Sequence, residues 1–334
     1  MRLYTFEVST VFGNHQRLGA ELPKNGKILD LNLAYSFMLS ERDDHPCAAK
    51  LADVLVPPDI LMLLQNGQFG LSAITEALDY FAGLGTGSDD ARGRNGETLL
   101  YNMAEIQIMA PVPRPLSIRD TVGFLGHIRG AMAPNPIPPV YEEIPAIYYK
   151  GNVHSVVGPE VDVIWPEFGD SLDYELEVAA VIGRQGVNIE ESDALDHVFG
   201  YTIFNDVSAR TQQYKDMEGM LGPTKGKDFD TGNIMGPALV TADEFDPQAS
   251  HEMTARVNGE EWSRGNLNQM DNGFAAIISY ISRHETLYPG DIIGSGTVTT
   301  GCGAELRKFP VPGDTVELEV EGIGVLRNRF VKQS

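Results

Sequence analysis

The sequence has few cysteines and no long apolar segment. Only two of its 334 residues are cysteine, Cys47 and Cys302, so disulfides do not form the framework of the fold. So few cysteines fit a reducing compartment, and we expect a cytoplasmic protein. No stretch reaches the roughly 18 unbroken apolar residues that a membrane-spanning helix needs. The first residues alternate polar and apolar side chains, unlike the charged start and apolar run of a signal peptide.

Positive charge is also scarce. Lys and Arg together number 25 against 47 Asp and Glu, which gives a formal net charge of −22. A surface this acidic repels phosphate backbones and anionic lipid headgroups. Nucleic acids and membranes are therefore not expected as partners. A small anionic substrate stays compatible with this charge, because the local charge of a site can oppose the charge of the whole chain.

Glycine and proline, by contrast, are frequent. The chain has 35 glycines and 20 prolines, which favours many turns and short strands. Its length corresponds to about two domains of roughly 150 residues each. A proline-rich break at 105–115 predicts the boundary, with a smaller β-rich domain over 1–110 and a second domain over 111–334. The first part is predicted to contain strands, a helix broken by Pro57 and Pro58, a second helix and a charged surface loop, over 1–40, 48–65, 73–83 and 83–97.

The second part is predicted to consist mainly of strands. Helical spacing is clear only at 208–217 and 273–284. Because few strands alternate with helices, a doubly wound parallel sheet is not expected, and the predicted fold class is α+β, mostly β. The strand-like runs are 160–165, 174–183, 198–206, 238–244, 253–259, 291–297 and 314–324.

Two carboxylates stand in the apolar run YELEVAAVIG. Residues i and i+2 of a strand point to the same face, so Glu175 and Glu177 are expected roughly 7 Å apart on one face. Buried together they would repel each other unless a hard cation or protons neutralised them. The alternative is an ordinary amphipathic strand with a solvated acidic face.

A third carboxylate, Asp206, ends the strand-like run YTIFND and precedes a helical segment. It is either a helix N-cap, for which Asp is a preferred residue, or a third oxygen ligand. On a continuous helix Arg210 and Gln213 would share its face. The Gly- and Pro-rich loop at 221–237 carries Lys225 and Lys227. It lacks the GxxxxGK[ST] pattern of a phosphate-binding loop, so its alternative interpretation is a solvated polar loop.

In combination these pieces resemble the fumarylacetoacetate hydrolase superfamily. An ExE strand, the NDVSAR turn, the GKDFDT loop, a late GSGT loop and the tail PGDTVELEVEGIGVLRN occur in the family's order over roughly 110–330. The resemblance implies a mixed β-roll catalytic domain and usually a homodimer. It also implies a divalent metal ion, Mg²⁺ or Ca²⁺, with Mn²⁺ as a further choice.

The resemblance also implies roles for single residues. His127, seven residues after Asp120, corresponds to a general base, and Glu305 is our candidate for the carboxylate that orients it. The implied metal ligands are Asp120, Glu175, Glu177 and Asp206. The implied oxyanion donors are Arg210, Gln213 and Lys227, and the implied substrate contacts are Tyr149, Lys150 and Thr297.

The expected activity is hydrolysis of a carbon–carbon bond in a 1,3-diketone or acylpyruvate-like substrate, as in the catabolism of aromatic compounds. The alternative is a metal-dependent decarboxylase, tautomerase, isomerase or hydratase acting on a 2-oxo acid. A metal-stabilised binding protein without turnover is the remaining alternative. Val122 and Pro136 stand where fumarylacetoacetate hydrolase itself has a tyrosine and an arginine. A substrate other than fumarylacetoacetate is therefore expected.

Overall fold

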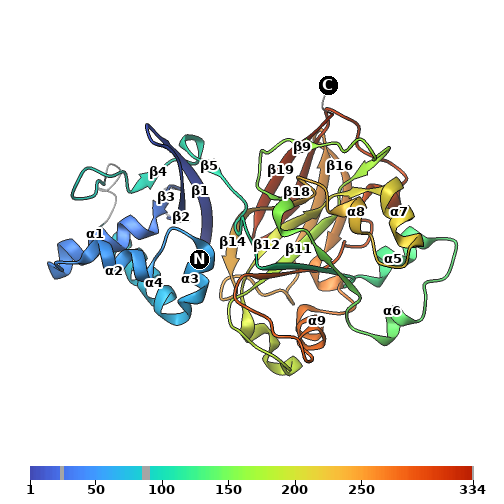
Figure 1. Cartoon of the computed structure of the whole chain (residues 1–334), viewed down its shortest axis with the longest axis horizontal. Helices are drawn as coiled ribbons and strands as arrows, with labels where there is room; N and C mark the ends of the chain where they lie inside the picture. Colours follow the sequence, from blue (N-terminus) through green and yellow to red (C-terminus); the bar gives the residue numbers. More distant parts are fainter. Residues whose placement is uncertain (23–25, 85–90, 333–334) are drawn as a thin grey trace.

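A long twisted sheet runs through the molecule (Figure 1). The computed structural model describes residues 1–22, 26–84 and 91–332. Within these ranges the strands of the sheet follow the order β4-β3-β2-β1-β14-β12-β11-β17-β6-β7, with β5 paired to β1 and β8 to β14. Their bounds are β1 (Arg2–Thr10), β2 (Gly13–Glu21), β3 (Ile28–Asp30), β4 (Leu100–Tyr101), β5 (Gln107–Ile108), β6 (Ser117–Thr121), β7 (Tyr148–Gly151), β8 (Val156–Val157), β11 (Leu176–Ile182), β12 (Val198–Asp206), β14 (Asn233–Thr241) and β17 (Asp291–Gly294).

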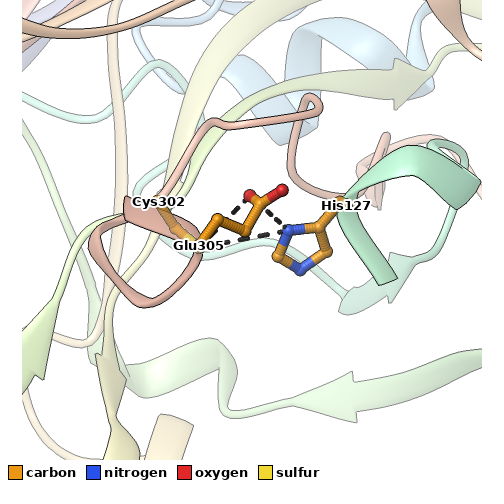
Figure 2. A group of neighbouring side chains, drawn as sticks. All are labelled: His127, Cys302 and Glu305. Carbon is orange, nitrogen blue, oxygen red and sulfur yellow. Dashed lines mark hydrogen bonds and ion pairs between the residues drawn. The ribbon is translucent and has the colours of Figure 1, made fainter. Parts of the chain in front are cut away.

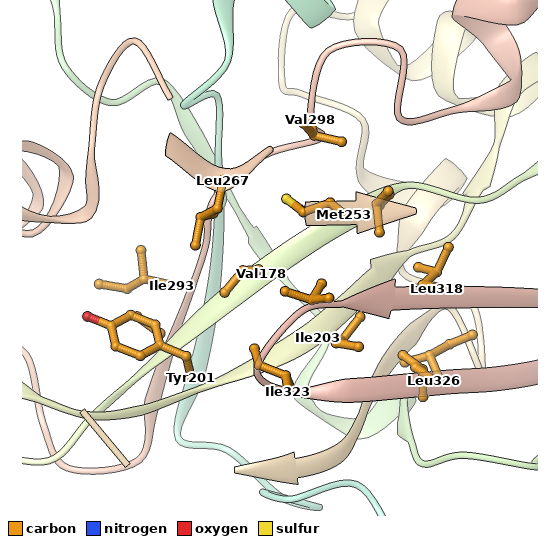
Figure 3. Packing of buried hydrophobic residues seen from close by; sticks show 14 of the residues in the cluster. Val178, Tyr201, Ile203, Met253, Leu267, Ile293, Val298, Leu318, Ile323 and Leu326 are labelled. Carbon is orange, nitrogen blue, oxygen red and sulfur yellow. The ribbon is translucent and has the colours of Figure 1, made fainter. Parts of the chain in front are cut away.

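A second sheet covers part of one face of the long sheet. Its strands follow the order β16-β15-β18-β19-β9, and β10 (Leu172–Asp173) pairs with β13 (Ser208–Ala209) nearby. Side chains from both sheets form one buried apolar cluster, among them Val178, Ile203, Leu318 and Leu326 (Figure 3). The bounds are β9 (Val163–Ile164), β15 (Glu252–Val257), β16 (Glu260–Asn266), β18 (Thr315–Val320) and β19 (Gly324–Val331). The mostly-β fold class is confirmed.

The α-helices lie at the two ends of the long sheet and around the half that the second part of the chain forms (Figure 1). Their bounds are α1 (Leu31–Asp43), α2 (Ala48–Leu55), α3 (Ile60–Gln65), α4 (Gly67–Gly83), α5 (Leu125–Met132), α6 (Val140–Glu143), α7 (Arg210–Glu218), α8 (Thr224–Lys227), α9 (Phe274–Ile281) and α10 (Gly303–Leu306). The helix predicted over 48–65 is broken at Pro57 and Pro58, as expected. The helices predicted at 208–217 and 273–284 correspond to α7 and α9.

The prediction of strands up to residue 40 is wrong beyond Asp30. The side chain of Asp30 accepts a hydrogen bond from the Leu33 backbone N–H and caps helix α1. Leu31, Ala34 and Met38 follow at helical spacing and are buried, so the apolar pattern of this segment has a period of a helix and not of a strand. The surface loop predicted at 83–97 falls partly on residues 85–90, which lie outside the described residues.

The N-terminal strands belong to the same long sheet as the strands of the second part. Strand β1 pairs antiparallel with β14, with Arg2 opposite Val240 and Leu3 opposite Leu239. A second apolar cluster contains side chains of α1–α4 together with Ala179 and Val181 of β11. The N-terminal part thus packs on the back of strands that carry the candidate site, while the domain division at residue 110 stays a prediction. No helix in the described ranges is long and apolar enough to cross a membrane.

Gly19 tests the close packing of side chains between the N-terminal strands. A Cβ at this position of β2 would lie 2.4 Å from Ile28 Cγ2 and 2.9 Å from the Leu29 carbonyl oxygen. We expect Gly19→Ala to lower the free energy of unfolding by about 1–3 kcal/mol, because overpacking forces neighbours out of their rotamers. Urea unfolding measures the change. Gly83→Ala, where nothing lies within 4 Å of the new Cβ, is the control. Equal stability of the two variants would contradict this account.

Candidate metal centre and active site

Three carboxylates from three strands meet at the centre of the long sheet. Asp120 lies near the end of β6, Glu177 lies on β11 and Asp206 ends β12. One oxygen of each lies within 4.8 Å of the others. Strand β17 separates β11 from β6 and places Gly294 between them. A Cβ on Gly294 would lie 2.3 Å from Asp120 Oδ1 and 3.2 Å from Glu177 Oε2. The glycine therefore leaves the room in which these carboxylates meet.

Each of the three carboxylates has a buried oxygen without a hydrogen-bond partner: Asp120 Oδ1, Glu177 Oε2 and Asp206 Oδ1. Burial, reinforced by the neighbouring carboxylates, raises the pKa of Asp120, raises the pKa of Glu177 well above its usual range, and raises the pKa of Asp206 to about 8. Unpaired buried charge is costly. Oxygen donors in this arrangement fit Mg²⁺, Ca²⁺ or Mn²⁺, which prefer carboxylate ligands.

Glu175, the fourth expected ligand, lies in the same group but has different partners. Its oxygens form ion pairs with Arg210 Nη1 at 2.8 Å and Lys227 Nζ at 2.5 Å. Although burial raises the pKa of Glu175, these two cations hold it at about 2. Lys227 also contacts Asp206, and the Tyr149 hydroxyl donates to Asp206 Oδ2 at 2.6 Å. Glu175 therefore stays ionised more readily than Asp120, Glu177 and Asp206, whose pKa values are all raised.

The ordinary structural alternatives for these residues do not hold. Glu175 and Glu177 are 3% and 0% exposed, so they do not form a solvated acidic face. Asp206 is not an N-cap, because α7 begins at Arg210 with Ala209 in the cap position. Lys227 is 3% exposed and is not a solvated loop lysine. Buried polar groups of this kind are expected at functional sites.

His127 and Glu305 form a hydrogen-bonded pair, with Cys302 next to it (Figure 2). His127 Nδ1 lies 2.8 Å from Glu305 Oε2, and the carboxylate is further held by the Thr300 backbone N–H at 2.9 Å and by Cys302 Sγ at 3.4 Å. A carboxylate accepts hydrogen bonds, so the imidazole donates from Nδ1, and in the neutral ring Nε2 is the nitrogen without a proton. This tautomer suits a general base.

A cavity of about 750 Å³ connects the pair to the carboxylates. Eight of the twelve expected site residues line it: Asp120, His127, Tyr149, Lys150, Glu175, Gln213, Lys227 and Thr297. Each of the other four expected residues contacts a residue that lines the cavity. Glu177 accepts a hydrogen bond from Thr297 at 3.1 Å, Arg210 donates to Gln213 at 2.9 Å, Asp206 contacts Lys227, and Glu305 contacts His127. Lys150 is mostly exposed and pairs with Glu285 at 3.0 Å. The structure thus brings the expected residues together around one pocket.

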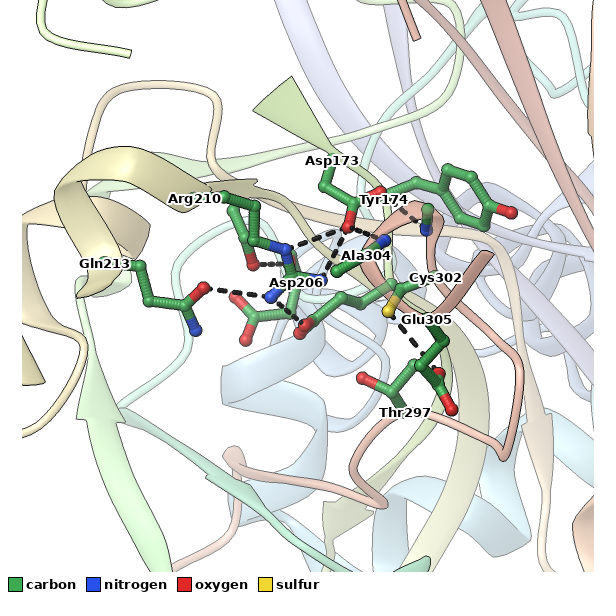
Figure 4. A network of polar contacts seen from close by, with 12 residues as sticks. Asp173, Tyr174, Asp206, Arg210, Gln213, Thr297, Cys302, Ala304 and Glu305 are labelled. Atoms are coloured by element: carbon green, nitrogen blue, oxygen red, sulfur yellow. Dashed lines mark hydrogen bonds and ion pairs between the residues drawn. The ribbon is translucent and has the colours of Figure 1, made fainter. Parts of the chain in front are cut away.

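Sequence reasoning missed Asp173. This side chain is fully buried and accepts hydrogen bonds from the backbone of Gly303 and Ala304 and from Arg210 (Figure 4). The only signal in the sequence was an acidic residue directly before the apolar run of β11, which does not reveal a contact 130 residues away. Cys302, whose thiol contacts Glu305, was also missed as a neighbour of the site.

Residues 117–331, which include every expected site residue, match the family model described as fumarylacetoacetate (FAA) hydrolase C-terminal. The mitochondrial oxaloacetate tautomerase FAHD2A of Homo sapiens is 32% identical, over 99% of this chain and 92% of that protein. Oxaloacetate tautomerase YisK of Bacillus subtilis (strain 168) is 33% identical, over 70% of this chain and 76% of that protein.

Solved structures have the same fold. The 2-hydroxyhepta-2,4-diene-1,7-dioate isomerase from Mycobacterium marinum superposes with a TM-score of 0.64 at 25% identity, covering 100% of this chain and 99% of that chain. A fumarylacetoacetate hydrolase from Exiguobacterium antarcticum gives a TM-score of 0.69 at 23% identity, covering 99% of this chain and 100% of that chain. The second likeness concerns the fold alone.

Glu177 tests the metal centre. Glu177→Gln removes a charge from the three-carboxylate cluster, and we expect its affinity for Mg²⁺ or Mn²⁺ to fall at least about 100-fold, because hard cations bind charged oxygen ligands. Isothermal titration calorimetry measures the affinity. Glu285→Gln, a carboxylate outside the cluster, is the matched control and should keep the affinity within about threefold. Unchanged binding by Glu177→Gln would mean that the cation binds elsewhere.

The pH dependence of stability tests the burial of Asp206. Its pKa is about 8 in the folded chain against an ordinary 3.8, so between pH 5 and 8 the folded state holds a proton that the unfolded state has lost. Metal-free protein should therefore lose stability as the pH rises through this window, by up to about 1.4 kcal/mol per pH unit for each such carboxyl. Urea unfolding in EDTA at pH 5, 6, 7 and 8 gives the slope, and Asp206→Asn should flatten it. Equal slopes for both proteins would contradict the prediction.

Proposed function

The chain belongs to the fumarylacetoacetate hydrolase family, and we propose that it is a metal-dependent tautomerase that interconverts the enol and keto forms of a small 2-oxo acid of the oxaloacetate type. The proposal is carried by one observation: His127, held by Glu305, and Asp120 of the carboxylate cluster line the same pocket. Full-length similarity to oxaloacetate tautomerases supports the choice of substrate. The more general statement, a family enzyme with an acidic metal-binding group, does not depend on this choice.

The residues supply what enolisation needs. A divalent cation held by Asp120, Glu177 and Asp206 would polarise the 2-oxo group and stabilise the enolate. His127 Nε2 accepts the proton of the enol hydroxyl, and the resulting imidazolium returns it to C3 of the substrate, so the reaction consumes no net proton. Glu305 holds the ring in one orientation throughout and stabilises its protonated form.

The opposite wall of the pocket offers donors for an anionic substrate. Gln213 Oε1 accepts a hydrogen bond from Arg210, which leaves the amide Nε2 group free to donate to a bound oxygen. Lys227 contributes positive charge between Glu175 and Asp206, and Tyr149 and Lys150 line the same space. Fixed donors in a water-poor site stabilise developing negative charge better than water does.

Carbon–carbon hydrolysis, the activity first expected from the sequence, is the second candidate. The observation that favours it is the same His127–Glu305 pair, since a histidine oriented by a carboxylate can also deprotonate a water molecule. The products decide between the two activities, because hydrolysis splits the substrate into a carboxylic acid and a second carbonyl compound, whereas tautomerisation leaves its carbon skeleton intact.

Mg²⁺ or Ca²⁺ as the bound ion, a homodimer and a cytoplasmic location belong to this proposal as well. They are inferences from the family resemblance and from the composition of the chain. The named human relative is mitochondrial, so the compartment has to be determined by imaging of the tagged protein in its own cells.

His127→Gln tests the chemistry. The metal-loaded protein is assayed with enol-oxaloacetate, acylpyruvates and 1,3-diketones, following enol absorbance and identifying products by NMR. We expect the wild type to accelerate ketonisation of enol-oxaloacetate without cleavage, and His127→Gln to lower kcat by about 10²–10⁴ because the positioned base is lost. His154→Gln, an exposed histidine, is the control. Hydrolytic cleavage of any substrate into a carboxylic acid and a second carbonyl compound would select hydrolysis, and near-normal turnover by His127→Gln would remove the ring from the mechanism.

A further inference from the structure

Asp173 is a buried carboxylate with four close contacts and no place in the pocket wall. Its Oδ1 accepts the Gly303 backbone N–H at 2.8 Å, and its Oδ2 accepts the Ala304 backbone N–H at 2.9 Å. Arg210 approaches the same Oδ2 through Nε at 2.9 Å and Nη2 at 2.7 Å. The side chain is 0% exposed, so these contacts are made without competition from water.

The contacts of Asp173 lead in two directions. On one side Arg210 continues to Glu175 and Gln213, which line the pocket. On the other side Gly303 and Ala304 begin α10, the short helix that carries Glu305. Figure 4 shows Asp173 between Arg210 and the segment that contains Cys302, Ala304 and Glu305.

Strand pairing and a glycine bring the neighbouring backbone close to Asp173. Strand β10 pairs with β13, placing Asp173 opposite Ser208 and therefore two residues from Arg210. A Cβ at residue 303 would lie 2.6 Å from Asp173 Oδ1 and 2.2 Å from the Lys308 carbonyl oxygen. Only glycine allows the segment to approach the carboxylate this closely.

We propose that Asp173 is a positioning residue for the reaction. By binding the 303–304 backbone and the Arg210 guanidinium at the same time, it holds Glu305 against His127. It also fixes α10 relative to the Arg210 side of the pocket. Glu305 receives its other hydrogen bonds from Thr300 and Cys302 of the same loop. Backbone hydrogen bonds join this loop to the start of β11 at Gly301 and Cys302, whereas Asp173 holds Gly303 and Ala304, the first residues of α10. Asp173 ties that loop to the strand that precedes Glu175 and Glu177.

The proposal predicts a loss of rate rather than of binding. Asp173→Asn keeps the shape of the side chain but replaces one acceptor oxygen by an NH2 donor. The remaining oxygen cannot replace both carboxylate oxygens as acceptors for the loop and Arg210. We expect kcat to fall about 10–100-fold, the usual effect of a misplacement near 1 Å, while the KM and the Mn²⁺ affinity change less than about threefold. This kinetic arm rests on the proposed function.

Asp30→Asn is the matched control. Asp30 is also 0% exposed, accepts a backbone N–H, and pairs with an arginine, Arg17, but it lies in the N-terminal part of the chain. Loss of stability without loss of kcat is expected for this variant. An equal loss of kcat in Asp30→Asn would show that destabilisation alone explains the Asp173 result and would overturn the proposal.

A double-mutant cycle with Glu305→Gln tests whether Asp173 acts through Glu305. If it does, the two losses are not additive, and the double variant has nearly the kcat of Glu305→Gln alone. Multiplication of the two losses would overturn the proposal.

Ala304→Pro provides a second route that keeps Asp173 itself, because it removes only one of the bound N–H groups in the first turn of α10, where proline is tolerated. Its kcat should fall about 3–10-fold, and an unchanged kcat would count against the proposal.

The last readout needs no substrate. The Nδ1 proton of His127 bound to Glu305 is expected as a downfield ¹H NMR resonance, assigned by its absence in His127→Gln. It should be lost or shifted in Asp173→Asn and Glu305→Gln and kept in Asp30→Asn. An unchanged resonance in Asp173→Asn would overturn the proposal even if the enzyme acts on oxaloacetate. A wild type that turns over none of the substrates would overturn the proposed function, and the NMR result would still decide the role of Asp173.

Discussion

The repulsion between carboxylates buried at the centre of a sheet is the constraint on which this structure depends. Asp120, Glu177 and Asp206 come from three strands of one continuous sheet and leave one oxygen each without a partner. Such a cluster is unfavourable unless protons or a cation neutralise it. Three neighbouring residues accommodate these carboxylates. Gly294 leaves room for them between the strands, Lys227 forms an ion pair with Asp206, and the Tyr149 hydroxyl donates a hydrogen bond to Asp206.

The same constraint links the metal centre to the catalytic pair. A polar chain leads from Asp206 through Lys227, Glu175, Arg210 and Asp173 to the loop that carries Glu305. Positive and negative groups alternate along it, so each charge has a neighbour that compensates for its burial. An acidic chain of net charge −22 can in this way concentrate Lys and Arg where an anionic 2-oxo acid would bind.

Much of this arrangement could be predicted from the sequence, because strand alternation places Glu175 and Glu177 beside each other and the family's motif order brings in Asp120, Asp206 and Lys227. Several strands of the second part were also predicted, since their apolar runs are long; β12 covers residues 198–206 as predicted. Strands β6, β7, β16 and β19 were not among the predicted runs. The sequence could not show that Glu175 faces two cations while Glu177 does not, because this depends on side-chain directions across neighbouring strands. Helix α1 was missed because the strands predicted for the N-terminal residues extended to residue 40. Asp173 was missed because Arg210 lies 37 residues away, and Gly303 and Ala304 lie 130 and 131 residues away.

Proteins similar to this chain are named as a tautomerase, an isomerase and a hydrolase, so the ion and the pocket have to be located before substrates can be ranked. The central claim is that the three-strand carboxylate cluster holds one divalent cation beside His127. Crystals soaked with Mn²⁺ and measured at a wavelength where manganese scatters anomalously test it most directly. We predict a single strong anomalous peak bounded by Asp120, Glu177 and Asp206, with oxygen ligands at about 2.0–2.6 Å. A peak at another position, or none at this cluster, would contradict the account.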